Sequence, residues 1–117
     1  MHYDGKIQDS EKSFYYTSRI ERIMEYVLAN LAEDLSIGTV AEKFDLNKNT
    51  LRHIFKKQQD ESYHDYVERM RMDQAFQLLI EGKWVKEVIA ATGYKNRSTF
   101  NNAFKKRFNH TPGFFKK

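Results

Sequence analysis

The chain contains no cysteine, a single proline (Pro112) and no long run of apolar residues. The lack of cysteine excludes disulfides and thiolate chemistry, which fits a reducing compartment. A membrane-spanning helix needs about 18 or more consecutive apolar residues, and the first 18 residues are polar, so we expect neither a membrane span nor a signal peptide. We therefore expect a cytoplasmic protein without a membrane partner.

The usual motifs of catalysis and cofactor binding are also missing. The four histidines are scattered and include no pair at i, i+4 spacing, so a zinc site has little support. There is no nucleophile elbow and no glycine-rich phosphate loop. We interpret His64 beside Asp65 as a surface pair rather than a catalytic dyad. The sequence thus predicts no enzyme activity, no metal, no cofactor and no small-molecule ligand for this chain.

Length and patterning predict an all-α fold of about seven helices. A chain of 117 residues is long enough for one compact domain or two small subdomains that share a helix. No segment alternates with period two, and the one proline comes late. Residues 1–17 are charged and lack periodicity, so we expect a flexible tail or linker there and a folded domain over residues 18–117.

Two stretches repeat one pattern, from Leu35 to Lys57 and again from Trp84 to Lys106. In each stretch, three apolar residues at helical spacing precede a polar turn, and three more follow it. The first stretch has Ile37, Val40 and Ala41, then Leu51, Ile54 and Phe55; the second has Val85, Val88 and Ile89, then Phe100, Ala103 and Phe104. The copies are offset by 48 residues before the turn and by 49 after it, so the second turn is one residue longer.

Capping signals and periodicity place the helices. We expect them at about 19–33, 37–44, 50–57, 62–80, 85–91 and 96–107, with a last turn from Thr111-Pro112. Ser18 with Glu21 forms a capping box for the first, and Ser36 caps the second. The helix over 62–80 joins the two repeats and is roughly 28 Å long at about 1.5 Å per residue. That length approaches the roughly 34 Å between successive major-groove faces of B-DNA.

Positive charge is concentrated in the second half of each repeat. The net charge is +4, but residues 47–57 carry four Lys or Arg, residues 95–117 carry seven, and neither block contains an acid. The remaining residues are net negative. Because two acid-free basic blocks occupy the same place in two repeats, we interpret them as a phosphate-binding surface.

This pattern predicts two helix-turn-helix units, over residues 35–57 and 84–107. The second helix of such a unit enters the major groove with its N-terminal residues facing the bases. Arginine and asparagine can form paired hydrogen bonds to bases, whereas lysine mostly contacts phosphate. We assign to bases the residues Asn49, Arg52, His53, Arg97, Asn101 and Asn102. We assign to the DNA backbone the residues Lys48, Lys56, Lys57, Lys95, Ser98, Lys105, Lys106 and Arg107.

Several short motifs carry a family resemblance. The first unit has Leu35-Ser36-Ile37 with Val40-Ala41, and the joining helix has Tyr66-Val67, Arg71-Met72, Ala75 and Leu78-Leu79. The second unit has Glu87-Val88, Gly93-Tyr94, Ser98-Thr99-Phe100, Ala103-Phe104-Lys105-Lys106, Phe108 and Thr111-Pro112. From about Arg19 to Lys116 the chain therefore resembles the DNA-binding domain of the AraC-type family of bacterial transcription regulators. The resemblance implies two helix-turn-helix units joined by a long helix, and promoter binding that activates or represses transcription.

Five positions differ from residues that are common in that family, among them Tyr63 in place of a frequent proline and Ile89 in place of a small alanine. Asp45 stands where glycine is common in the first turn, and aspartate tolerates the left-handed conformation at some cost. His53 and Asn102 stand where arginine is often found. Because guanine-binding guanidinium groups are lost there, we expect a target site that favours A·T base pairs.

Two other functions are compatible with the sequence. One is a protein-interaction module that contacts RNA polymerase or another regulator and binds DNA weakly. The other is RNA binding, although exposed aromatic platforms on a sheet are lacking. Our prediction is double-stranded DNA as the partner, bound by a monomer at an asymmetric site of two adjacent grooves. The sequence leaves open the target promoter, activation against repression, the inducing signal, and whether the chain is a complete regulator or part of a longer sensor protein.

Overall fold

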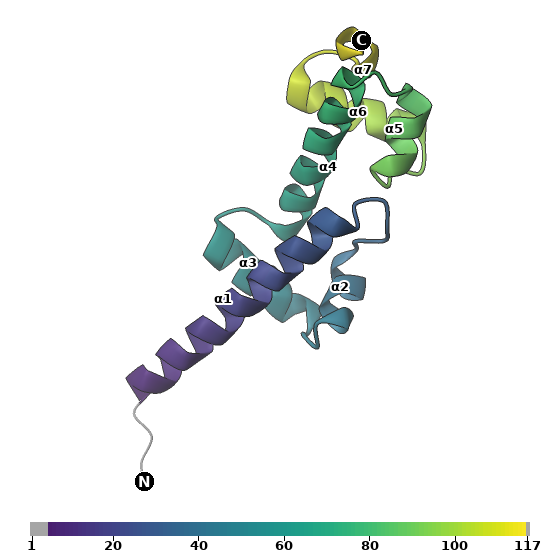
Figure 1. Ribbon diagram of the computed structural model, residues 1–117. Coiled ribbons are helices and arrows are strands. Elements are labelled where there is room, and N and C mark those ends of the chain that lie inside the picture. Colours follow the sequence, from purple (N-terminus) through teal and green to yellow (C-terminus); the bar gives the residue numbers. More distant parts are fainter. Residues whose placement is uncertain (1–4, 117) are drawn as a thin grey trace.

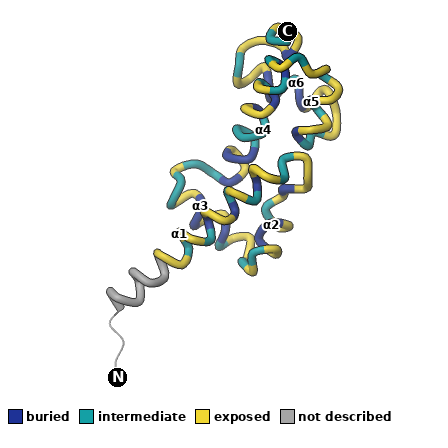
Figure 2. The backbone as a smooth tube through the Cα atoms, viewed as in Figure 1, coloured by how far each residue is buried: buried dark blue, intermediate teal, exposed yellow. Residues whose placement is uncertain are grey.

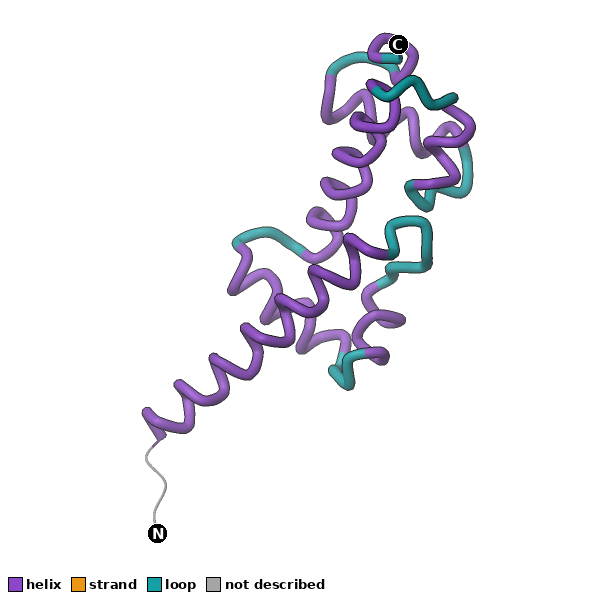
Figure 3. Tube along the Cα trace, viewed as in Figure 1, coloured by secondary structure: helices purple, strands orange, loops and turns teal. Residues whose placement is uncertain are grey.

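Seven helices form the part of the chain that the structure describes (Figure 1). The computed structural model describes the backbone of residues 5–116 and the side chains of residues 14–116. The helices are α1 (Gly5–Ala29), α2 (Ile37–Lys43), α3 (Lys48–Gln59), α4 (Tyr63–Ile80), α5 (Val85–Ala91), α6 (Arg97–Phe108) and α7 (Pro112–Phe115). Loops connect them and no strand occurs within residues 5–116, so the prediction of an all-α fold is confirmed (Figure 3). No helix within this range is both long and apolar enough to cross a membrane.

The first helix starts earlier and ends sooner than the sequence predicted. We expected a tail over residues 1–17 and a helix from 19 to 33, but α1 already begins at Gly5 and ends at Ala29. Ser18 therefore lies inside the helix, and the predicted capping box is wrong. Residues 6–17 contain neither glycine nor proline, so nothing in them stops a helix from propagating backward from the part that is held by the core. The first four residues of the predicted tail lie outside the described residues.

Buried side chains form two separate cores, and α4 contributes to both (Figure 2). The first core lies among α1, α2, α3 and the N-terminal half of α4. The second lies among the C-terminal half of α4, α5 and α6, and Phe115 of α7 packs against it. We call these groups of helices the first and the second unit. The contributions of α4 are Tyr63, Tyr66 and Val67 to the first core and Met72, Ala75 and Leu79 to the second.

The change of core along α4 explains an error in the predicted apolar face of this helix. We expected one face that included Met70, Phe76 and Leu78, but these residues are only partly buried, and Met72 is buried completely. From Val67 to Met72 an α-helix turns by roughly 140° beyond one full turn. The apolar side therefore shifts around the helix axis, and a single periodic stripe misses Met72.

The second helices of the two units, α3 and α6, begin and end in the same way. Asn47 precedes α3 and accepts a hydrogen bond from the amide of Asn49 at 2.8 Å. Asn96 precedes α6 and accepts one from the amide of Thr99, also at 2.8 Å. Each helix ends at a residue in the left-handed conformation, Asp60 or Asn109. These caps fix where the exposed first turn of each helix starts.

The turn inside each unit contains one residue in the left-handed backbone conformation, but the residue type differs between the two units. Asp45 has a φ of 56°, which confirms the prediction that aspartate occupies this conformation in the first turn. Gly93 has a φ of 79° in the second turn.

The start of α2 differs from the prediction. Ser36 is the N-cap residue, but its hydroxyl donates to the Thr39 hydroxyl at 2.9 Å and accepts no bond from a helix amide. The Thr39 hydroxyl donates in turn to the carboxylate of Asp34, which also accepts from the amide of Ser36 at 2.9 Å. Ser36 therefore occupies the predicted cap position, but the carboxylate of Asp34, and not a bond from the serine side chain to a helix amide, organises this helix start.

Candidate nucleic-acid interface

The outward face of α3 presents the predicted contact residues of the first unit. Leu51, Ile54 and Phe55 point into the core. The exposed residues of this helix include Lys48, Asn49, Arg52, His53, Lys56 and Lys57. Arg52 donates a hydrogen bond of 2.6 Å to the side-chain oxygen of Asn49, one helical turn earlier. This bond holds the guanidinium group along the exposed face.

The outward face of α6 is the counterpart in the second unit. Phe100, Ala103 and Phe104 are buried. The exposed residues include Arg97, Ser98, Asn102, Lys105, Lys106 and Arg107, and Lys95 is exposed in the turn before the helix. Apart from Asn101, the structure thus exposes the predicted residues of each unit on one helix or in the turn before it.

Asn101 differs from the other predicted contact residues because it is half-buried. Its side-chain oxygen is covered and has no hydrogen-bond partner among the residues that the structure describes. A paired contact with adenine needs both the amide oxygen and the amide nitrogen. In this conformation Asn101 cannot make that contact, whereas the neighbouring Asn102 is exposed and can.

Arg107 is engaged within the protein. Its guanidinium group donates to the carboxylate of Asp73 on α4 at 2.9 Å and lies 5.5 Å from the ring centre of Phe108. Arg107 therefore ties the end of α6 to α4. A DNA phosphate at this position would have to compete with Asp73 for the same guanidinium group.

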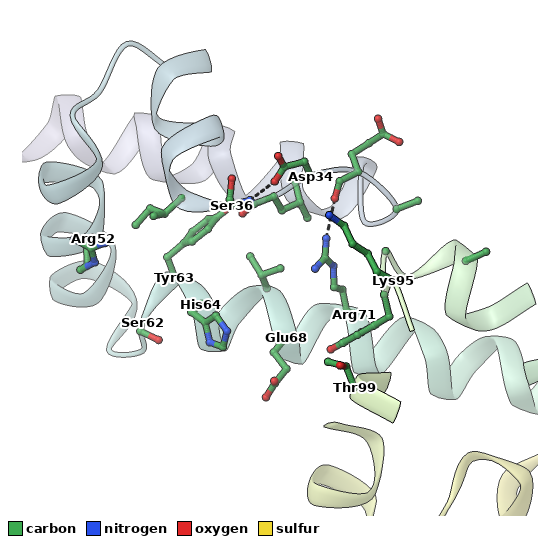
Figure 4. Close-up of a pocket in the computed structure, with 18 residues that line it drawn as sticks. Asp34, Ser36, Arg52, Ser62, Tyr63, His64, Glu68, Arg71, Lys95 and Thr99 are labelled. Atoms are coloured by element: carbon green, nitrogen blue, oxygen red, sulfur yellow. Dashed lines mark hydrogen bonds between the residues drawn. The ribbon is translucent and has the colours of Figure 1, made fainter. Parts of the chain in front are cut away.

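A groove of about 940 Å³ separates the two units and has α4 as its floor (Figure 4). One wall is the loop that carries Asp34 together with Arg52 of α3, and the opposite wall is the turn that carries Lys95, followed by Thr99. The hydrogen bond from the amide of Ser36 lowers the pKa of Asp34, and the hydroxyl of Thr39 and the positive charge of Lys95 contribute. The groove therefore carries charges of both signs between the two basic helices.

Arg71 crosses this groove, and its role was not predicted. Its Nε donates to the carbonyl of Leu31 at 3.1 Å, and a terminal nitrogen donates to the carbonyl of Glu33 at 2.8 Å. The same guanidinium group lies 5.9 Å from the ring centre of Tyr94 in the second unit. The sequence singled out Arg71 only as part of a family motif. Its carbonyl partners lie 40 and 38 residues away along the chain, so no local pattern could reveal them.

The histidine beside Asp65 lies at the surface, as predicted. His64 Nδ1 is 3.7 Å from a carboxylate oxygen of Asp65, and the two side chains are 84% and 71% exposed. Within the described residues, no group of three His, Cys, Asp or Glu side chains could hold a metal ion.

Comparisons with known proteins agree on one family. A family model described as a helix-turn-helix domain matches residues 40–117. The probable transcription factor PqrA of Proteus vulgaris is 32% identical over 85 residues, which cover 72% of this chain and 70% of that protein. An uncharacterised helix-turn-helix transcriptional regulator from the cgkA 5′ region of Pseudoalteromonas carrageenovora is 29% identical over 123 residues, 97% of this chain and 74% of that protein.

Solved structures show the same fold. The C-terminal domain of AraT, a response regulator from Geobacillus stearothermophilus, superposes with a TM-score of 0.80 at 24% identity, covering 84% of this chain and 83% of that one.

Other curated regulators are much longer than the matched part. The chain spans 32% and 36% of two of them.

Proposed function

Since the chain belongs to the AraC-type family of helix-turn-helix transcription regulators, we propose that it regulates transcription by placing α3 and α6 in two successive major grooves on one face of a promoter. The single observation that carries this proposal is that α3 and α6 each expose a basic, acid-free face. The two helices lie near opposite ends of α4 (Figure 1). We infer that the protein acts in the cytoplasm as a monomer, since its two units differ and an asymmetric site would suit them.

The length of α4 supports binding to adjacent grooves. Its 18 residues span roughly 27 Å at about 1.5 Å per residue. Successive major-groove faces are roughly 34 Å apart, so the length of α4 approaches this separation. One helix can therefore space the two recognition helices by about the required distance.

The contacts divide into base recognition and backbone binding. We propose that Asn49, Arg52 and His53 of α3, and Arg97 and Asn102 of α6, contact base edges. Asn101 belongs to this set only if its covered amide rotates outward. The residues that contact phosphates and set the register of the protein on the duplex are Lys48, Lys56, Lys57, Lys95, Lys105 and Lys106, together with Ser98 and Arg107.

The base-contacting residues imply a sequence preference. Asparagine pairs with adenine through its donor and acceptor, and arginine pairs with guanine. Since the second unit presents Asn102 beside a single base-reading arginine, Arg97, we expect that half of the site to be rich in A·T pairs. A selection from random duplex DNA would test this, and a G-rich consensus opposite Asn102 would reject it.

A footprint on the selected DNA tests the main proposal. We expect two protected major-groove segments about 10 base pairs apart on one face. Replacing Asn49, Arg52 and His53 together by alanine should remove protection of one segment, and replacing Arg97 and Asn102 should remove protection of the other. The exposed Lys83, which lies outside both recognition helices, provides a control: Lys83→Ala should leave the footprint intact.

The salt dependence of binding separates this function from the interaction module. Six to ten phosphate contacts should weaken binding on the order of 10³- to 10⁵-fold between about 50 and 200 mM salt. A flat salt response, or protection without two segments, would favour a protein that contacts RNA polymerase or another regulator instead.

A further inference from the structure

The two units meet directly beside α4, in a region that we call the interunit contact. It consists of Leu31 and Glu33 in the turn after α1, Arg71 in α4, and Gly93 and Tyr94 in the turn between α5 and α6. Arg71 links the three segments, because it donates to the two carbonyls and lies against the ring of Tyr94.

Gly93 shows how closely the two units approach. A side-chain carbon added to Gly93 would lie 2.5 Å from the carbonyl oxygen of Leu31 and 2.8 Å from a terminal nitrogen of Arg71. Both distances are shorter than carbon atoms in proteins tolerate. The turn of the second unit is therefore seated against the backbone of the first, and the φ of 79° adds a second reason for glycine.

The location of the cores makes this contact important for orientation. The buried side chains of the two units form separate clusters, and α4 runs through both. A single helix can bend and can twist slightly along its length. The interunit contact lies to one side of α4, so it opposes rotation of one unit against the other in a way that the helix alone does not.

We propose that Arg71 is a positioning residue that fixes the distance and rotation between α3 and α6, and that it thereby sets the spacing of the two half-sites that the protein accepts. The part of this inference that concerns half-site spacing rests on the proposed function. Arg71 has two donor groups in a fixed plane, which lets it bind two carbonyls at once. Lysine carries its charge at a single point and cannot reproduce this geometry.

The mechanism has a measurable consequence for DNA binding. One added base pair moves a half-site by roughly 3.4 Å and rotates it by roughly 35° about the helix axis, since B-DNA has about 10 to 10.5 base pairs per turn. A protein with fixed units cannot follow that change with both recognition helices. A protein whose units rotate freely can follow it at a smaller loss.

The first test measures spacing preference. The probes are the duplex selected by the wild-type protein and two versions with one base pair inserted or removed between the half-sites. We expect the wild type to lose affinity for the altered duplexes by about tenfold or more. Arg71→Met should bind the original duplex several-fold more weakly and should discriminate among the three by less than about threefold.

A matched control is available on the same helix. Arg69 pairs with Glu61 at 2.5 Å and lies over the ring of Tyr66, and both partners belong to the first unit. Arg69→Met should therefore keep the wild-type spacing preference. If Arg71→Met fails to fold by circular dichroism, Arg71→Lys replaces it and should show the same loss of discrimination.

The second test needs no DNA. Because the chain lacks cysteine, spin labels can be attached to cysteines introduced at the exposed Lys57 and Lys106. The distance distribution between the labels should be narrow in the otherwise wild-type protein and broader after Arg71→Met. If the wild type selects no bipartite DNA, the proposed function fails and this arm still tests Arg71. A folded Arg71 variant with a narrow distribution and unchanged spacing preference overturns the inference.

Discussion

Gly93→Ala tests how much folding free energy depends on the close approach between the two units. The new methyl group would lie 2.5 Å from the backbone oxygen of Leu31 and 2.8 Å from the Arg71 guanidinium group. A flexible side chain can move away, but a backbone oxygen moves only with its loop. The substitution therefore forces the turn after α1 away from the second unit.

Two terms give the expected magnitude. Alanine in the left-handed conformation costs about 1 to 2 kcal/mol relative to its preferred conformation. Forcing an extra carbon into a packed site typically costs about 1 to 3 kcal/mol more. Gly93→Ala should thus lower the free energy of unfolding by roughly 2 to 5 kcal/mol, and the melting temperature by about 10 °C or more.

Urea and thermal unfolding followed by circular dichroism measure this change. Asp45→Ala is the matched comparison, because Asp45 is also left-handed but is exposed in the first turn. It should show only a conformational cost of about 1 kcal/mol. The difference between the two variants isolates the interunit clash. If Gly93→Ala is no less stable than Asp45→Ala, the close approach does not contribute and the reasoning is refuted.

Three further predictions concern other parts of the molecule. Arg52→Ala should relax base preference at one position at a cost of about 1 to 3 kcal/mol, whereas Lys57→Ala should weaken all sequences alike and reduce the salt slope by about 1; quantitative binding selections on both variants check this. Tyr63→Phe should destabilise the protein by about 1 to 3 kcal/mol in urea denaturation, because the buried Tyr63 hydroxyl donates to the Leu35 carbonyl at 2.7 Å and its loss leaves that oxygen without a partner. The pKa of Asp34 is lowered on folding, so its ionised form stabilises the protein above its unfolded pKa of about 3.9, and this contribution is lost as the pH falls through the folded value. The stability difference between wild type and Asp34→Asn should therefore shrink below about pH 4, and a constant difference would contradict the assignment.

The spacing of apolar residues predicted the helices well where all apolar residues of a helix pack into the same core. Leu51, Ile54 and Phe55 recur at helical spacing and all point inward, so the exposed face of α3 followed directly. The same holds for Phe100 and Phe104 in α6. Periodicity predicts which residues face outward whenever a helix packs against a single partner surface.

The errors arise where structure depends on distant residues or on the exact side-chain rotamer. The start of α1 was misplaced because Ser18 looks like a cap, although nothing before it interrupts the helix. Asn101 shares the spacing of an exposed residue, but its amide oxygen is turned inward. Arg71 acts on carbonyls of a turn about 40 residues away. Spacing along the sequence carries none of this information.

The separation of the two cores has a consequence for how such a protein can change over time. A substitution among the core residues that pack against α3 does not change the side chains that pack against α6. Each recognition helix can therefore acquire a different base preference without destabilising the other. Exchange of whole units between related chains should be tolerated on the same grounds. The turn after α1, Arg71 and Gly93 must be compatible with one another in any such exchange, because they contact each other where the two units meet. Base preference is thus free to diversify one half-site at a time, while the geometry between the half-sites is inherited as a unit.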